Sequence, residues 1–193
     1  MINDIHDLGL VLDSKVKLVV IESWDERRVL ETLTSLAVKR GLGLYTWAVT
    51  EGLQRLGFAA DVSEESASLE PEAALKLIKH DPQPNLYVLC DLHPFLVDNP
   101  KLVRLLKEIA LAEGAHKPTL VLVSHALKLP VEVQRYAARF ALALPSEEEL
   151  LAIVRDEATR WSEGNRGARV RTDNRTLQQK EKNLRGMSHA EAR

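Results

Sequence analysis

Residues 16–50 read VKLVVIESWDERRVLETLTSLAVKRGLGLYTWAVT, and this stretch decides the fold class. Residues 16–22 form an apolar run rich in β-branched side chains, which is typical of a strand buried on both faces. Ser23 is a predicted helix N-cap, apolar residues then recur at helical spacing, and Gly41 marks the end of the helix. Residues 43–50 predict a second strand. A strand, a helix and a strand in such close succession indicate a βαβ unit and a parallel sheet.

The alternation of strands and helices continues along the chain. Further strands are predicted at 85–92, 118–124 and 139–144, and further helices at 71–80, 100–114, 131–137 and 146–161. Residues 51–70 lose the pattern and indicate a solvated connection. The sequence therefore predicts an α/β fold in which helices flank a parallel, five-stranded, doubly wound sheet.

Composition limits the classes of function. The chain has 193 residues, 45% of them hydrophobic, and a net charge of −2, so no global field draws it to nucleic acid or to an acidic membrane. Its one cysteine, Cys90, excludes an intramolecular disulfide. No apolar run approaches the roughly 20 residues of a membrane span, and residues 1–10 lack a basic signal region. We expect a cytoplasmic protein without membrane contact.

The composition changes after residue 161. We expect residues 1–161 to form the α/β domain and residues 162–193 to form a basic linker and the start of a helical lid. Ser188 and Glu191 have capping-box spacing just before Arg193, which indicates the front part of a longer polypeptide. The basic residues after 161 are interleaved with acidic ones and lack a stacking aromatic, so a linker or lid is favoured over nucleic-acid binding.

Ligands of doubly wound sheets bind beyond the carboxyl ends of the strands, so the strand exits carry the functional prediction. After the first strand, a nucleotide triphosphatase has G-x-x-x-x-G-K-[ST], whose backbone N–H groups and lysine hold the phosphates. Residues 22–28 instead read ESWDERR, without a glycine. Nowhere in the chain is a glycine directly followed by a lysine. The phosphate-binding loop is therefore missing.

Two other exits keep polar residues. The strand LYVLC ends at Asp91, as in a magnesium-holding Walker B strand, but Leu92 follows where an active enzyme has a glutamate. Asp91 is favoured as the cap of a turn over a metal ligand. Ser124 and His125 follow the next strand, at the position of a sensor of the terminal phosphate, or are ordinary loop residues.

The histidines and tryptophans lack the spacing of a known site. No metal-binding spacing is found among His80, His93, His116 and His125. His93 and His125 follow neighbouring strands, which leaves a weak polar site between them open. Trp24 either plugs the vacated phosphate pocket or packs against its own turn, and Trp47 is a predicted core residue. Neither Ser23 nor Ser124 has a nucleophile elbow, so no hydrolase triad is predicted.

The chain resembles a known family along essentially its whole length. The segments KVKLVVIESWDERRVLETL, NLYVLCDLHPFL, TLVLVSHALKLP, LPSEEELLAIVRD and NLRGMSHAEAR are similar to the N-terminal region of AAA-family ATPases of cyanobacteria, other bacteria and some plastid genomes, known there as a conserved hypothetical chloroplast frame. In that family a degenerate AAA-like domain precedes a catalytic AAA domain that binds ATP and Mg²⁺. The resemblance implies that Asp91, Ser124 and Arg193 occupy vestigial Walker B, sensor and lid-arginine positions.

The departures from the family pattern direct the functional prediction. We expect a non-catalytic module with no metal or cofactor of its own, which acts in assembly, partner binding or regulation of a downstream ATPase domain. Its partners are then proteins, including that domain, and the full-length protein forms an oligomer if its AAA domains build a ring. The alternative is a nucleotide-binding or ATP-hydrolysing domain in which Arg27 and Arg28 replace the missing lysine, because arginine binds phosphate well.

Overall fold

The computed structural model describes residues 2–56, 69–114, 117–165, 184, 186–187 and 191 of the chain. The chain divides into two compact units, Met1–Leu142 and Ala143–Arg193. The division of domains at residue 161 stays a prediction.

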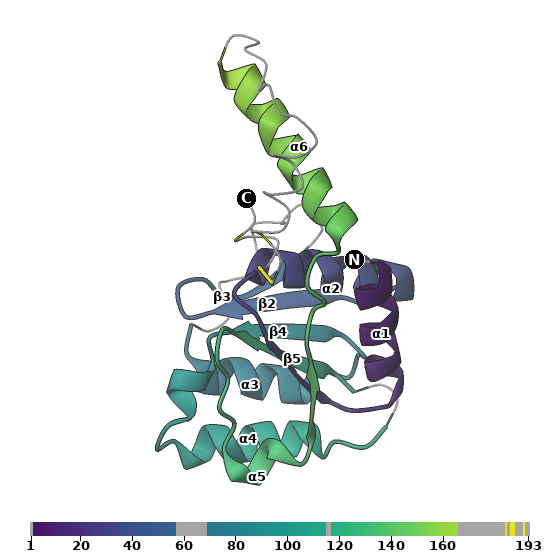
Figure 1. The fold of residues 1–193 in the computed structure, drawn as a ribbon. Coiled ribbons are helices and arrows are strands. Elements are labelled where there is room, and N and C mark those ends of the chain that lie inside the picture. The colour runs from purple at the N-terminus through teal and green to yellow at the C-terminus, as the bar shows by residue number, and fades with distance from the viewer. Residues whose placement is uncertain are drawn as a thin grey trace. The chain divides into compact units, whose positions relative to one another are not determined.

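The first unit is an α/β sandwich around one six-stranded sheet (Figure 1). Its elements in chain order are α1 (Ile2–Asp13), β1 (Leu18–Glu22), α2 (Glu26–Arg40), β2 (Leu44–Ala48), β3 (Gly52–Leu56), α3 (Pro71–His80), β4 (Leu86–Cys90), the 3₁₀ helix η1 (His93–Leu96), α4 (Pro100–Ala110), β5 (Thr119–Ser124), α5 (Val131–Gln134) and β6 (Ala137–Phe140). The strand order is β3-β2-β4-β5-β1-β6. All neighbours are parallel except β2 and β3, which are antiparallel.

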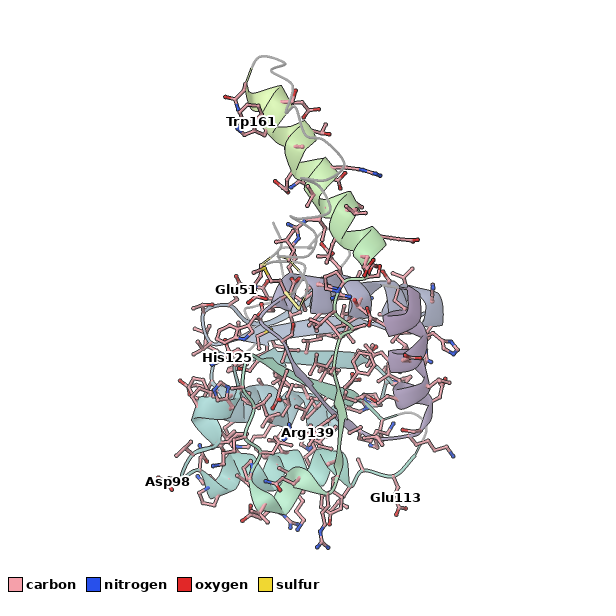
Figure 2. All side chains as sticks on the ribbon, in the orientation of Figure 1. Glu51, Asp98, Glu113, His125, Arg139 and Trp161 are labelled. Atoms are coloured by element: carbon pink, nitrogen blue, oxygen red, sulfur yellow. The ribbon has the colours of Figure 1, made fainter. Side chains whose placement is uncertain are left out.

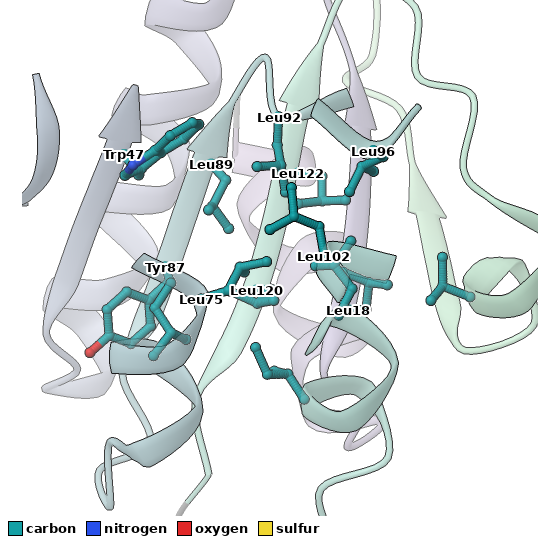
Figure 3. Close-up of a cluster of buried hydrophobic side chains, with 14 of the residues drawn as sticks. Leu18, Trp47, Leu75, Tyr87, Leu89, Leu92, Leu96, Leu102, Leu120 and Leu122 are labelled. Carbon is teal, nitrogen blue, oxygen red and sulfur yellow. The ribbon is translucent and has the colours of Figure 1, made fainter. Parts of the chain in front are cut away.

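The sheet is buried on both faces, as the apolar runs predict. Alternate residues of β1 point to opposite sides, so Leu18 and Val20 join one hydrophobic cluster while Val19 and Ile21 join the other. The first cluster lies under α3, α4 and α5 and includes Trp47 (Figure 3). The second lies under α1 and α2. Because helices pack on both faces of the sheet, polar side chains next to the strands are confined to the outer strands and to the ends of the strands.

The α/β fold with a mostly parallel sheet is confirmed, and the structure adds three elements that were not predicted, which are β3, α1 and the short 3₁₀ helix η1. The strand β3 forms an antiparallel edge where a solvated connection was expected, so the sheet has six strands rather than five. The helix α1 packs on α2 ahead of the first strand. The last strand also begins earlier than expected, at Ala137, and ends at Phe140.

Some helix ends follow the predicted signals, whereas the helices predicted at 100–114 and 131–137 end earlier, at Ala110 and Gln134. Gly41 ends α2 in the left-handed conformation with φ of 64°, and Pro71 begins α3. The N-cap of α2 is Asp25 rather than Ser23, since the Asp25 side chain accepts from the Arg28 backbone N–H.

The second unit contains α6 (Glu147–Gly164). Ser146 and Glu149 cap each other's backbone in the predicted capping box. Leu150 and Ile153 are the buried residues of this helix. No described helix has a stretch long and apolar enough to cross a membrane.

Candidate functional site

The candidate site lies at the carboxyl ends of the parallel strands, and we call this side of the sheet the edge. Glu22, Ala48, Cys90 and Ser124 are the last residues of β1, β2, β4 and β5, and these strands are adjacent in the sheet. The turns that follow them are therefore neighbours in space, although they are far apart in sequence. Glu51 and His125 lie on this side of the sheet, whereas Glu113, which precedes β5, lies on the opposite side (Figure 2).

The turn between β1 and α2 stands where a phosphate-binding loop would lie. The Asp25 backbone N–H donates to Ser23 Oγ at 3.0 Å, and the Arg28 backbone N–H donates to Asp25 Oδ1 at 3.1 Å. A carboxylate of the chain therefore occupies the first turn of α2, where a phosphate would otherwise accept from backbone N–H groups. The Ser23 backbone N–H donates to the Ser124 carbonyl at 2.9 Å and ties this turn to β5.

The vestigial residues Asp91 and Ser124 are in contact. Ser124 Oγ donates to Asp91 Oδ1 at 2.7 Å, and the Asp91 backbone N–H donates to the Val123 carbonyl at 3.0 Å. Asp91 is exposed and has a left-handed φ of 51°, a conformation that aspartate tolerates better than most residues. The bond to Ser124 and the turn geometry support the interpretation of Asp91 as a turn residue.

The environment of Cys90 is acidic. Burial is the largest cause that raises the pKa of the Cys90 thiol, and together with the nearby carboxylates of Glu26, Asp91 and Glu51 it brings this pKa to about 12. These three side chains come from α2 and from the exits of β4 and β2. We call Glu26, Glu51 and Asp91 the acidic rim. A triphosphate approaching this edge would meet like charge.

Trp24 does not fill a pocket. Its side chain is 74% exposed and stacks on His125, with ring centroids 4.5 Å apart and an interplanar angle of 29°. His93 approaches His125 edge-on, with centroids 6.0 Å apart. The structure thus brings together the two histidines that follow neighbouring strands and adds the tryptophan. We call Trp24, His93 and His125 the aromatic cluster.

The two arginines considered as substitutes for the phosphate-loop lysine are held in ion pairs. Arg27 Nε lies 3.0 Å from Glu31 one turn further along α2. Arg28 Nη2 lies 2.8 Å from Asp4 Oδ2 of α1, and both of these side chains are buried. Arg193, the third vestigial position, lies outside the described residues.

Sequence reasoning missed the role of Glu22. Its Oε1 atom accepts from the Leu127 backbone N–H at 3.1 Å and from Arg139 Nη1 at 2.8 Å. These bonds join the end of β1 to the loop after β5 and to the edge strand β6. The only signal in the sequence is a carboxylate at the end of an apolar strand, which does not identify partners more than a hundred residues away.

The remaining candidates form no site among the described residues. His80 Nδ1 donates to the Lys76 carbonyl at 2.7 Å, and the side chain is exposed on α3. His116 lies outside the described part of the chain. Within that part, no three His, Cys, Asp or Glu side chains gather as metal ligands would. Trp47 is fully buried, as predicted.

The strand order and the exits define a P-loop-type α/β domain in which the phosphate-binding loop has been replaced. The chain belongs to the family described as the SpoVK-like AAA ATPase, N-terminal domain, whose pattern matches residues 4–142. The predicted identity as an AAA N-terminal domain is thereby confirmed. The matched region ends where the first compact unit ends.

The fold is similar to a solved AAA domain. A crystal structure of the FIGL-1 AAA domain in complex with ADP superposes with a TM-score of 0.60 at 14% identity, over 92% of this chain. The chain spans 58% of the length of that structure. At this identity the likeness concerns the fold alone. No curated protein sequence matches the chain.

Proposed function

We propose that this AAA ATPase N-terminal domain is a non-catalytic module that binds a protein partner and regulates an ATPase domain following it in the full-length protein. The observation that carries the proposal is the first turn of α2, where Asp25 caps the helix and Glu26 faces the same edge. In a phosphate-binding loop this turn offers free N–H groups and a lysine to the phosphates. Here it offers carboxylates.

The hydrolytic positions support the same proposal. Asp91 accepts from Ser124 and is followed by the buried Leu92, so the carboxylate that would activate a water has no counterpart at that position. Without a phosphate-loop lysine and without this carboxylate, neither binding nor attack on the γ-phosphate is supplied by the residues at the exits. ATP and Mg²⁺ would then bind only in the following domain.

The competing function is ATP binding through atypical contacts. It requires Arg27 and Arg28 to leave Glu31 and Asp4, and for Arg28 this would leave a buried aspartate without its ion pair. That requirement favours the non-catalytic proposal.

Calorimetric titration of the 193-residue chain with ATP and Mg²⁺ tests the proposal, with pyrophosphate as the control for charge alone. We expect no saturable heat from either ligand up to millimolar concentration. Saturable binding of ATP in the micromolar range, weakened by Arg27→Gln or by Asp91→Asn, would overturn it.

A further inference from the structure

Two rings of the aromatic cluster, Trp24 and His125, are exposed at a place where the fold normally binds a ligand, and His93 is half-buried beside them. Trp24 is 74% exposed, more than Trp161 at 51%, while the third tryptophan, Trp47, is fully buried. A tryptophan held in place by stacking on one histidine presents the rest of its ring to solvent. Exposed tryptophans in preformed positions are typical anchors of protein interfaces.

The acidic rim lies beside this cluster. In the order of the sheet, the exits of β2, β4, β5 and β1 carry Glu51, then Asp91 and His93, then His125, then Trp24 and Glu26. Neighbouring strands are spaced about 4.8 Å apart, so the four exits span roughly 15 Å. The effect of all three carboxylates on the Cys90 thiol agrees with this convergence.

Two arginines close to this edge already have acidic partners. Arg139 pairs with Glu22 and Arg27 pairs with Glu31. Among the described residues, no ion pair involves Glu26, Glu51 or Asp91. Within the described part of the chain, this edge therefore combines the exposed rings of Trp24 and His125 with three carboxylates that form no ion pair.

We propose that the aromatic cluster and the acidic rim together form a docking surface for an arginine-bearing segment of a partner protein. A guanidinium group is planar, so it stacks on tryptophan or histidine rings and pairs with a carboxylate through two parallel hydrogen bonds. Lysine has neither the planar face nor the fork of donors. This inference rests on the proposed function, since it names the surface and the partner chemistry of the module.

The charge of the surface separates this partner from others. Nucleic acids and nucleotides carry phosphates, which the acidic rim repels. A purely apolar segment would use Trp24 but leave the three carboxylates desolvated and unpaired, which is costly. A basic segment with arginine satisfies both parts of the surface.

The test is calorimetric titration of the 193-residue chain with a twelve-residue peptide that contains three arginines among glycine and leucine residues. Matched peptides carry lysine or glutamine in place of arginine. We expect saturable binding of the arginine peptide, at least fivefold weaker binding of the lysine peptide and none of the glutamine peptide. Raising the salt concentration is expected to weaken the arginine complex.

Variants assign the binding to this edge. Trp24→Ala is expected to weaken binding about tenfold, and the pair Glu51→Gln with Asp91→Asn about fivefold while flattening the salt dependence. The matched controls are Trp161→Ala, an exposed tryptophan of the second unit, and Glu113→Gln, a carboxylate at the opposite edge (Figure 2). Both controls are expected to bind like the unmodified chain. Circular dichroism checks that each variant is folded.

Equal binding of the arginine and lysine peptides, no binding of either, or full binding by a folded Trp24→Ala variant would overturn the docking surface. None of these results contradicts the proposed non-catalytic function, which fails only if the chain binds ATP and Mg²⁺ saturably. The two proposals are therefore tested by separate titrations of the same protein.

Discussion

The strands of the sheet and the turns at their carboxyl ends retain different parts of the AAA pattern. In the strands, almost every residue of β1, β4 and β5 is buried and apolar, and alternate side chains supply the two hydrophobic clusters. In the turns, the residues that would bind phosphate are replaced by Asp25, Glu26 and an exposed Trp24. The interior keeps the fold while the edge has changed its chemistry.

This difference follows from how the two properties depend on residues. The free energy of folding is summed over many buried side chains at roughly 25 cal/mol per Å² of apolar area, so no single position decides it. Phosphate binding depends on a few backbone groups and one lysine at a single turn. A chain can therefore lose the second property and keep the first. If this separation holds, substitutions in the interior affect stability and substitutions at the edge do not.

The largest effect is expected from Trp47→Ala. Trp47 of β2 is fully buried in the first hydrophobic cluster (Figure 3). Its ring meets that of Phe95 edge-on, with centroids 6.0 Å apart. Its removal leaves a large cavity and is expected to lower the free energy of unfolding by about 3–5 kcal/mol. Urea denaturation followed by circular dichroism measures the change. A loss below about 1 kcal/mol would show that the interior tolerates the removal of a large buried side chain, and that stability does not depend on the interior as expected.

Asp4→Ala tests whether Arg28 contributes to stability as an interior residue does, although Arg28 lies in the first turn of α2, close to the edge. Its guanidinium lies 2.8 Å from Asp4, and the two side chains are 7% and 4% exposed. Removing the carboxylate leaves a buried charge without this partner, which is expected to cost about 3 kcal/mol of unfolding free energy.

The control for Asp4→Ala is the double variant Asp4→Leu with Arg28→Met. It removes both charges and is expected to recover most of the lost stability. Equal stability of the single variant and the unmodified chain would contradict a structural role for this pair.

The elements that the sequence predicts well are those with long apolar runs. Residues 18–21, 86–90 and 119–124 are buried on both faces, and their composition alone predicts strands. The strand β3 was missed because its sequence, GLQRL, has Gln54 and Arg55 at an edge where only one neighbour pairs with it. An edge strand needs no continuous apolar run, so tertiary pairing decides its conformation.

The candidate site was predictable in its location and only partly in its contacts. The absence of the phosphate loop and the positions of Asp91 and Ser124 follow from the sequence and the strand order. The stacking of Trp24 on His125 and the pairing of Arg28 with Asp4 join residues from different elements. Such pairs depend on how α1 and the loops pack, which local patterns do not encode.

The pH dependence of stability tests whether the Cys90 thiol, at the end of β4, belongs to the buried interior. Because its pKa is raised from an ordinary value of 9.0 to about 12, the folded chain keeps a proton that the unfolded chain releases above pH 9. Unfolding therefore releases a proton in this range, and stability falls as pH rises from 9 towards 12. We expect a contribution of about 1 kcal/mol between pH 9 and pH 10.

Cys90→Ala isolates this contribution, since the other titrating groups are common to both proteins. Urea unfolding of both at pH 8, 9 and 10 is expected to show a shallower decline for the variant. Parallel declines would mean that the thiol is as accessible in the folded chain as in the unfolded chain.

The smallest effect on stability is expected from Trp24→Ala, which makes the same substitution as Trp47→Ala at the edge of the sheet. Trp24 is 74% exposed and its described ring contact is with His125, so folding buries little of its surface. We expect a change within about 0.5 kcal/mol in the free energy of unfolding, measured by the same urea titration. A loss of more than about 2 kcal/mol would mean that Trp24 is part of the fold's stability. In that case the edge and the interior would not be separable, and weaker peptide binding by this variant would no longer distinguish docking from folding. A loss within the expected range leaves partner binding as the property that this tryptophan serves.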